Sequence, residues 1–213
     1  MQKRGSEFFV EAGTFVTPEA KIFAKSNDIS IVEGSSVKSQ KYIDHFTGKM
    51  LSEKPEDMTH IIGNRLVRKN DLRIAFRGQA DKLQAYIVRL GALSVSKNRK
   101  LLEDLGELQA FVRKLMLAEI KQEPLPPPVL FGMDSEEIRI RSHKCDGRFE
   151  SHPMPCASHG VVAAELNLLR TMARELELCA VNALPDRTDI IEHLNRLSSA
   201  VYILYIRAVA GEY

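Results

Sequence analysis

The sequence predicts an all-α protein, a four- to five-helix bundle with a small mixed N-terminal extension. Apolar residues recur at helical spacing through four long or medium segments, whereas runs with the alternation of a strand are short and few. The chain has 213 residues, of which 44% are hydrophobic, enough for one sizeable core. We expect two parts, a small extension over 1–55 and a helical-bundle domain over 56–213.

Composition limits the classes of partner. The 30 Lys and Arg residues against 28 Asp and Glu residues leave a formal charge of +2, so no broad field for a polyanion exists. Nucleic acid is therefore not an expected partner, and any anion site must be local. We expect neither a signal peptide nor a membrane span, hence a cytoplasmic location. The three cysteines are odd in number and fit reduced thiols there.

The first 71 residues give mixed signals. VTPEAKIFAKSND predicts a short helix that begins at Thr17 with Pro18 in its first turn. ISIVEG is rich in β-branched residues and predicts a brief strand. The stretch 54–71 carries Pro, Gly and Asn, and we expect an extended, ordered loop that leads into a helix capped at Asn70 or Asp71.

Two long helices are expected next. The first shows helical period through Leu72, Ala75, Leu83, Tyr86, Ile87 and Leu90. Gly78 lies within it, which indicates either a close approach by a backbone or ligand, or a merely tolerated glycine. The second helix spans Lys97 to Lys121, and three prolines at 126–128 then enforce an extended linker. MDSEEIRIR predicts a short third helix after the linker.

The segment that follows is irregular and dense in possible metal ligands. These are His143, Cys145, His152, Cys156 and His159. The residue types suit zinc or iron, yet their spacings match no standard closed site. We interpret the cluster either as loop residues beside a ligand or as ordinary polar loop chemistry, and expect no bound metal.

The run from Ser158 to Leu184 is the clearest helix. At about 100° per residue, Arg170, Arg174 and Glu177 fall within roughly 60° of one another. They border an apolar stripe of Leu166, Leu169, Ala173, Leu176 and Ala180. Two guanidinium groups one turn apart can hold several phosphate oxygens. The alternative is that they are ion-pair partners of Glu165 or Glu177 on the outer face of a bundle.

A last helix is expected from Thr188 to Ala210. Its apolar face comprises Ile190, Ile191, Leu194, Leu197, Val201 and Leu204. Asn195, Ser198 and Tyr202 form a polar stripe at i, i+3 and i+7. We interpret Tyr202 and Tyr205 as core or interface tyrosines. Facing helices of bundles often turn polar residues inward to form sites, so this stripe is a candidate wall of one.

Three separated motifs, in order, resemble a known family. THIIGNRLVRKNDLRIAFRGQADKLQA, AELNLLRTMARELE and LNRLSSAVYILYIRA are similar to motifs of the corrinoid adenosyltransferases of the propanediol-utilisation type. KPEDMTH, PMPCASHG and LNRLSS resemble the ethanolamine-utilisation branch in particular. The resemblance implies transfer of the 5′-deoxyadenosyl group of ATP, with Mg²⁺, to the cobalt of reduced cobalamin, which gives adenosylcobalamin and triphosphate.

The resemblance also implies roles for individual residues. Thr59 and Lys69 would wrap the polyphosphate, and Arg170 and Arg174 would be its main cations, with Lys69 and both arginines acting in catalysis. Asn195 would contact the nucleotide, and Glu177 would lie beside it. Asp81 would pair with Arg170 across a subunit boundary, because members of the propanediol type are trimers with ATP bound between subunits. We therefore expect a homotrimer with composite sites.

The sequence departs from the family pattern at several positions. No glycine-rich loop precedes Thr59, and Ser199 stands where the family has an aspartate. The N-terminal third holds His45 but no cysteine, so the metal motif of some ethanolamine-type members is missing. His152 aligns with a phenylalanine that lies under the corrinoid, and Phe149 is near. Both His152 and Phe149 are candidate corrinoid contacts.

Two other functions remain open at this point. One is a non-catalytic carrier or scaffold that delivers adenosylcobalamin to a partner enzyme, and the missing glycine-rich loop favours it. The other is a helical interaction module whose arginines only make ion pairs. An adenosyltransferase of the ethanolamine branch would have a reductase and an adenosylcobalamin-dependent lyase as partners, and would be cytoplasmic or associated with a metabolic microcompartment.

Overall fold

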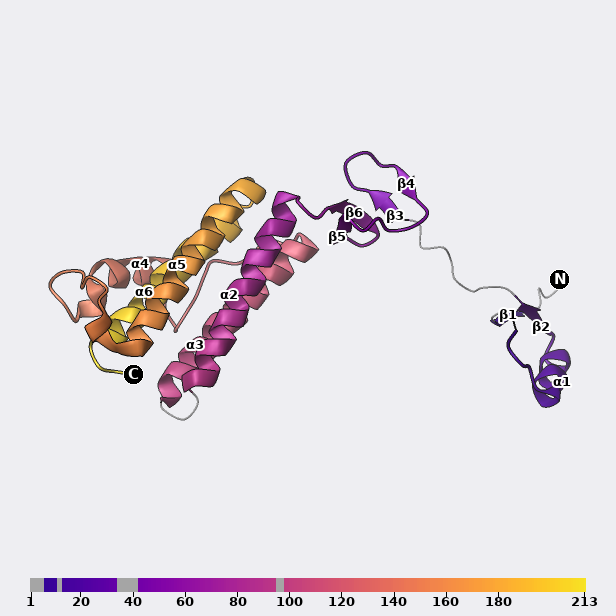
Figure 1. Ribbon diagram of the computed structural model, residues 1–213, viewed down its shortest axis with the longest axis horizontal. Helices are drawn as coiled ribbons and strands as arrows, with labels where there is room; N and C mark the ends of the chain where they lie inside the picture. The colour runs from indigo at the N-terminus through magenta and orange to yellow at the C-terminus, as the bar shows by residue number, and fades with distance from the viewer. Residues whose placement is uncertain (1–5, 11–12, 34–41, 95–97) are drawn as a thin grey trace. The chain divides into compact units, whose positions relative to one another are not determined.

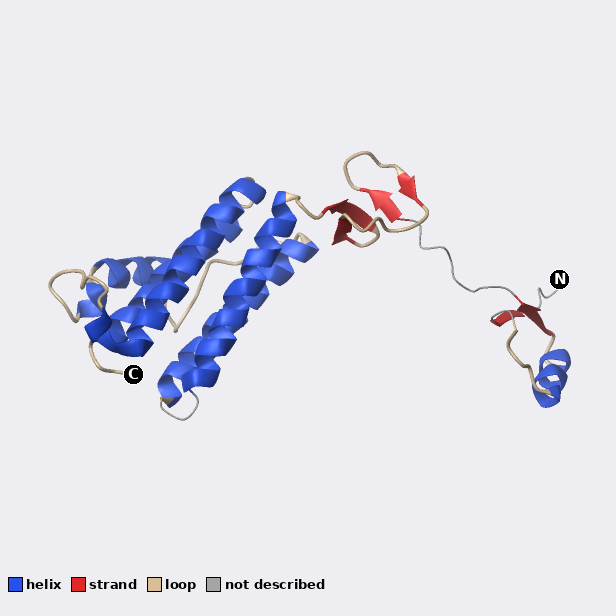
Figure 2. Ribbon diagram, in the orientation of Figure 1, coloured by secondary structure: helices blue, strands red, loops and turns tan. Residues whose placement is uncertain are grey.

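The computed structural model describes residues 6–10, 13–33, 42–94 and 98–213 (Figure 1). Contacts within the chain divide it into two units, Met1–Pro55 and Glu56–Tyr213. The second unit is dominated by helices, and strands occur only before the first long helix (Figure 2). This confirms the predicted fold class, a helical bundle with a small mixed N-terminal extension.

The first unit contains short strands and one short helix. Strand β1 (Ser6–Val10) pairs in parallel with β2 (Ile29–Glu33), and α1 (Pro18–Ser26) connects them. The Thr17 hydroxyl accepts a hydrogen bond from the amide of Ala20 at 3.3 Å, as expected of a helix cap. Strands β3 (Tyr42–Asp44) and β4 (Met50–Leu51) form an antiparallel pair. The predicted helix and the strand at ISIVEG are confirmed, whereas β1, β3 and β4 were not predicted.

The second unit begins with a hairpin where we predicted an extended loop. Strands β5 (Met58–Ile62) and β6 (Arg65–Arg68) are antiparallel, and the turn between them contains Gly63 at φ 53°. The prediction of a loop over 54–71 was wrong because four apolar side chains of this stretch are buried and hold it as paired strands: Met58, Ile61, Leu66 and Val67. A Gly-Asn pair between two short apolar runs favours a hairpin, even though polar residues surround it.

The bundle consists of four long helices and one short one. They are α2 (Leu72–Ser94), α3 (Arg99–Lys121), α4 (Ser135–His143), α5 (Gly160–Ala183) and α6 (Thr188–Val209). Asp71 Oδ1 accepts from the Arg73 amide at 2.9 Å, which confirms the cap predicted for α2. The Asn98 side chain caps α3 by accepting from the amide of Leu101 at 3.0 Å. Helix α5 packs against α6 and α2, and α4 packs against α6.

The core lies between the apolar faces of these helices. All five residues of the predicted stripe on α5 have no exposed surface: Leu166, Leu169, Ala173, Leu176 and Ala180. On α2 the apolar face starts one turn later than predicted, because Leu72 is 57% exposed and Ala75 is also exposed. A Cβ built at Gly78 would meet no atom of the described chain within 4 Å, so no close approach within the chain requires this glycine. None of the described helices is both long and apolar enough to cross a bilayer.

A buried histidine is expected to make the stability of the bundle depend on pH. His193 is 3% exposed, its ring lies 5.2 Å from that of Phe111, and its Nδ1 donates to the carbonyl oxygen of Asp189 at 2.8 Å. Burial lowers the pKa of His193, so the unfolded chain binds its proton more tightly. The contribution of neutral His193 to the free energy of unfolding is then fully present above about pH 6.5. It falls as the pH drops below that value, by at most about 1.4 kcal/mol per pH unit.

Urea unfolding between pH 7.5 and 5 checks this expectation. His193→Leu should flatten the dependence of the free energy of unfolding on pH, whereas His143→Gln, which changes an exposed histidine on α4, should not. Equal slopes for the wild type and His193→Leu would show that another group controls this range. The Arg187 guanidinium lowers the pKa of Asp189, and that contribution is lost only in more acidic solution, below about pH 4.

Candidate functional site

A polar cavity of about 470 Å³ opens among α4, α5, α6 and the loop that joins α4 to α5. Its described lining consists of basic, hydroxyl and amide side chains: Arg139, Ser142, His143, His152, Arg170, Arg174, Asn195, Arg196, Ser198, Ser199 and Tyr202. The polar stripe predicted on the last helix, Asn195, Ser198 and Tyr202, forms one wall. The arginines of α5 form another, since they border the buried face of that helix.

The two arginines of α5 do not pair with the carboxylates of their own helix. Glu165 accepts from Tyr86 and Arg89, and Glu177 accepts from Asn195 at 2.9 Å. The ion-pair alternative that the sequence left open is therefore not what the described chain forms. The reason is that neighbouring helices offer both carboxylates partners across the helix interface.

The charges in the cavity are not neutralised by carboxylates. Arg170 donates to Asn167 Oδ1 at 3.0 and 3.1 Å, and Arg174 is exposed with no hydrogen bond or ion pair to the described chain. Arg196 donates to Ser135 Oγ and Asn195 Oδ1, each at 2.7 Å. All these acceptors are uncharged, so they do not offset the positive charge of the guanidinium groups. The described lining contains no Asp or Glu, which makes the cavity a local site for an anion.

A histidine and a tyrosine close one side of the cavity. The Tyr202 hydroxyl lies 2.7 Å from Nδ1 of His152, and Sγ of Cys145 lies 3.5 Å from the same nitrogen. Burial, reinforced by Cys145, raises the pKa of Tyr202 to about 12. The phenol is therefore protonated near neutral pH and can donate to His152. Tyr205 is 1% exposed and belongs to the core, as predicted, whereas Tyr202 is a wall of the cavity.

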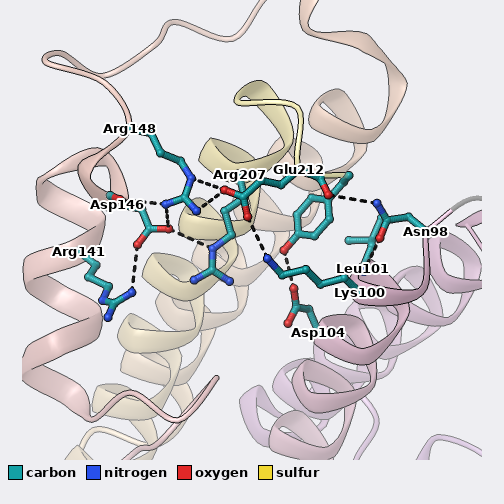
Figure 3. A network of polar contacts seen from close by, with 10 residues as sticks. Asn98, Lys100, Leu101, Asp104, Arg141, Asp146, Arg148, Arg207 and Glu212 are labelled. Carbon is teal, nitrogen blue, oxygen red and sulfur yellow. Dashed lines mark hydrogen bonds and ion pairs between the residues drawn. The ribbon is translucent and has the colours of Figure 1, made fainter.

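The loop that carries His152 is fixed by a buried carboxylate. Asp146, with a side chain only 2% exposed, accepts from Arg148 at 2.5 Å, from Arg207 of α6 at 3.0 Å, and lies 3.5 Å from Arg141 of α4 (Figure 3). It lies in a 3₁₀ turn, Cys145–Gly147, in which all three residues have positive φ. Left-handed backbone at two non-glycine residues costs free energy, and the ion pairs offset it.

The segment after α6 continues this network towards α3 (Figure 3). Glu212 pairs with Arg148 and, at 2.9 Å, with Lys100, while the Tyr213 hydroxyl donates to Asp104 Oδ2 at 2.5 Å. The side-chain amide of Asn98 donates to the carbonyl oxygen of Glu212 at 3.2 Å. The start of α3, the end of α6 and the loop beside the cavity are thereby connected.

Other predicted site residues lie outside this cavity. Thr59 pairs with Val67 within the hairpin, and the exposed Lys69 follows β6. Asp81 is exposed on α2, and Phe149 is partly buried against the core. The structure thus brings together four of the predicted residues, Arg170, Arg174, Asn195 and His152, and Glu177 accepts a hydrogen bond from Asn195. It does not bring Thr59, Lys69, Asp81 or Phe149 into the cavity.

Sequence reasoning did not include Arg139 or Arg196 in the site, and it considered His143 only as a member of the His and Cys cluster. Arg196 stands next to Asn195 in a motif already recognised, so that motif could have suggested it. Arg139 and His143 are four residues apart in a helix, a spacing that places them on one side. The helix was predicted, but which of its sides meets the cavity depends on how it packs on α6.

The His and Cys residues of the loop do not form a metal centre in the described chain. No three His, Cys, Asp or Glu side chains converge there as a set of ligands. His159 Nδ1 lies 3.1 Å from the Tyr205 hydroxyl, and Cys156 Sγ lies 3.0 Å from Ser158 Oγ. A larger hollow of about 690 Å³ in the first unit has Lys21, Lys25 and Asp28 as the charged side chains of its described lining. It lacks the convergent cations of the bundle cavity.

Comparisons with known proteins agree on one family. A family model described as cobalamin adenosyltransferase matches residues 50–208. The corrinoid adenosyltransferase EutT of Salmonella typhimurium is 34% identical over 165 residues, which are 74% of this chain and 61% of that protein. EutT of Escherichia coli K12 is 33% identical over 169 residues, 76% of this chain and 62% of that protein. The chain spans about three fifths of the length of these curated relatives.

Solved structures share the fold. A variant of the PduO-type ATP:corrinoid adenosyltransferase from Lactobacillus reuteri, complexed with cobalamin and ATP, superposes with a TM-score of 0.60 at 20% identity, over 74% of this chain and 91% of that one. Another variant of that enzyme, complexed with ATP, gives 0.58 at 21% identity with the same coverage. Because the family model spans 50–208 of the 213 residues, the chain belongs to the cobalamin adenosyltransferase family, and it is similar in sequence to the EutT enzymes.

Proposed function

We propose that the protein transfers the 5′-deoxyadenosyl group of ATP to the cobalt of a reduced corrinoid, giving adenosylcobalamin and triphosphate. The observation that carries this proposal is the cavity built on the helix of Arg170 and Arg174, whose guanidinium groups meet no carboxylate of the described residues. Family membership and the names of the curated relatives support it, as does the binding of cobalamin and ATP by the L. reuteri enzyme.

The reaction requires alignment and stabilisation of a leaving group. Cobalt(I) is itself a strong nucleophile, so its electron pair forms the bond to the 5′ carbon without a general base. The bond between that carbon and the triphosphate oxygen breaks, and negative charge develops on the leaving triphosphate. Arg170 and Arg174 would stabilise this charge with preorganised donors. Holding the cobalt and the 5′ carbon in line would lower the barrier by several kcal/mol more. The described lining has no carboxylate, so these residues do not fit a protein-bound Mg²⁺, and we assign that ion no step.

The nucleotide-loop residues would act between subunits. Thr59 and Lys69 lie in and after the hairpin, outside the cavity of their own chain, so a homotrimer would let them reach the cavity of a neighbour. Asp81 is exposed on α2 and free to pair with Arg170 of the partner subunit. Asn195, held by Glu177, would contact the nucleotide from within the chain. His152 at the cavity wall and Phe149 beside it would contact the corrinoid.

An anaerobic turnover assay tests the proposed function. Protein given ATP, Mg²⁺ and chemically reduced cobalamin is expected to form a light-sensitive adenosyl product and to release triphosphate in equal amount. A parallel reaction with a chelator that spares Mg²⁺ shows whether a transition metal is needed. If the wild-type protein binds neither ATP nor cobalamin, the proposal is wrong.

A carrier function is the second candidate, because no glycine-rich loop precedes Thr59. A carrier would bind adenosylcobalamin without turnover, and its arginines on α5 would be dispensable. As an enzyme, the protein would serve ethanolamine utilisation, working with a reductase and an adenosylcobalamin-dependent lyase in the cytoplasm or in a metabolic microcompartment. Co-purification with these partners from cells grown on ethanolamine checks that context.

A further inference from the structure

Helix α4 contributes a second basic wall to the cavity. Arg139, Ser142 and His143 line it from this helix, and Arg196 of α6 lies beside them. At about 100° per residue, the three α4 residues share one side of the helix. Arg139 and His143 lie outside the three motifs that carry the resemblance to corrinoid adenosyltransferases. Their presence in the cavity is therefore a property of this chain that its family motifs do not account for.

The two arginines of α4 differ sharply in their surroundings. Arg141, on the opposite side of the helix, meets Glu137 at 2.6 Å and Asp146 at 3.5 Å. Arg139 has no hydrogen bond or ion pair from its side chain to the part of the chain that the structure describes, although Glu136 and Glu137 are near in sequence. One charge of the helix is thus compensated within the fold, and the other faces the cavity uncompensated.

The number of free charges indicates the class of ligand. Arg139, Arg170, Arg174 and Arg196 bring four formal positive charges to one cavity, and every acceptor that their side chains meet in the described chain is neutral. Like charges held this close repel one another unless an anion lies between them. The planar forks of guanidinium groups match phosphate oxygens. A single phosphate bound by the two arginines of α5 would leave the α4 wall uncompensated.

We propose that Arg139 and His143, with Arg196, bind a second phosphate group, separate from the oxygens that Arg170 and Arg174 hold. This inference rests on the proposed function for its ligands. The phosphate comes from one of two sources: the distal end of the nucleotide's triphosphate, or the phosphodiester in the lower nucleotide of the corrinoid. Both present tetrahedral anionic oxygens to the same donors.

Calorimetric titration without turnover tests this. The probes are inorganic tripolyphosphate, cobalamin, and cobinamide, which lacks the phosphodiester. Arg139→Gln is expected to raise the Kd of one phosphate-bearing probe about tenfold. If the nucleotide is the source, the variant binds tripolyphosphate more weakly. If the corrinoid is the source, the variant binds cobalamin more weakly while its Kd for cobinamide is unchanged. Arg139→Lys keeps the charge but loses the two-pronged guanidinium geometry, so its Kd should lie between those of the wild type and Arg139→Gln.

Arg141→Gln is the matched control, since it removes the same charge from the same helix while Asp146 keeps Arg148 and Arg207. The proposal is overturned if Arg139→Gln and Arg141→Gln have the same Kd for every probe, or if Arg139→Gln raises the Kd of cobalamin and of cobinamide equally. It is also overturned if no probe binds the wild type. A protein that binds in the expected pattern but forms no adenosyl product would refute the proposed function and leave this inference standing.

Discussion

Replacing Arg174 with alanine is expected to lower kcat/KM for adenosyl transfer by about 10²–10³-fold, the usual effect of losing one preorganised donor to a developing negative charge. Arg174 faces the cavity and has no hydrogen bond or ion pair within the described chain, so its removal breaks no contact that holds the fold. The loss should therefore appear in catalysis and in ATP binding, while the melting temperature stays within about 1 °C of the wild type.

The same anaerobic assay, run over a range of ATP concentrations, separates these effects. Arg174→Lys should recover part of the rate, because an ammonium keeps the charge but not the bidentate geometry. Arg141→Gln, whose charge is already met by Glu137, should be close to wild type. Unchanged kcat/KM in Arg174→Ala would instead favour the carrier function, in which this arginine has no catalytic work.

Glu119→Gln is expected to destabilise the bundle by about 3 kcal/mol, the low end for one partner of a buried ion pair, which lowers the Tm by about 8 °C. The Glu119 side chain is 1% exposed and accepts from Arg73 at 2.8 Å and from Arg77 at 2.7 Å. Both arginines belong to α2 and are less than a fifth exposed, so neither can recover full hydration when the carboxylate is lost.

The effect should extend to the hairpin. Arg77 also donates to the carbonyl oxygen of Ile61 in β5 at 2.9 Å, so Glu119 fixes the arginine that holds β5 against the bundle. Thermal unfolding followed by circular dichroism measures the stability, and hydrogen exchange at β5 reports the hairpin. The matched control is Glu103→Gln on the same helix, whose pair with Arg99 is exposed and contributes at most about 0.5 kcal/mol. Equal shifts in the two variants would contradict this account.

The helices could be predicted because each carries its own signal. The stripe on α5 has the period of a helix, and capping residues such as Thr17 and Asp71 mark starts. The hairpin of β5 and β6 escaped prediction because its strands are short and polar residues surround its Gly-Asn turn. Leu72 was placed in the core on its period alone, yet it is exposed, because the buried face of α2 begins only at Phe76.

The site was only partly predictable. Arg170 and Arg174 could be singled out as a pair because their spacing is local, and the family motifs added Asn195. Arg139 and His143 could not be assigned, since their membership depends on the side of α4 that faces α6. Thr59, Lys69 and Asp81 lie away from the cavity of their own chain, and their roles stay predictions that an oligomer must test.

The sequence by itself determined the helical bundle, the arginine pair of α5 and the family motifs, because these rest on period, capping and spacing within single segments. Only the tertiary structure decided what surrounds that pair. Packing of α5 on α2 and α6 gives Glu165 and Glu177 other partners, and packing of α4 on α6 brings Arg139 to the cavity. Contacts between segments distant in sequence depend on the whole fold, so no local pattern could specify that Arg174 keeps its charge uncompensated.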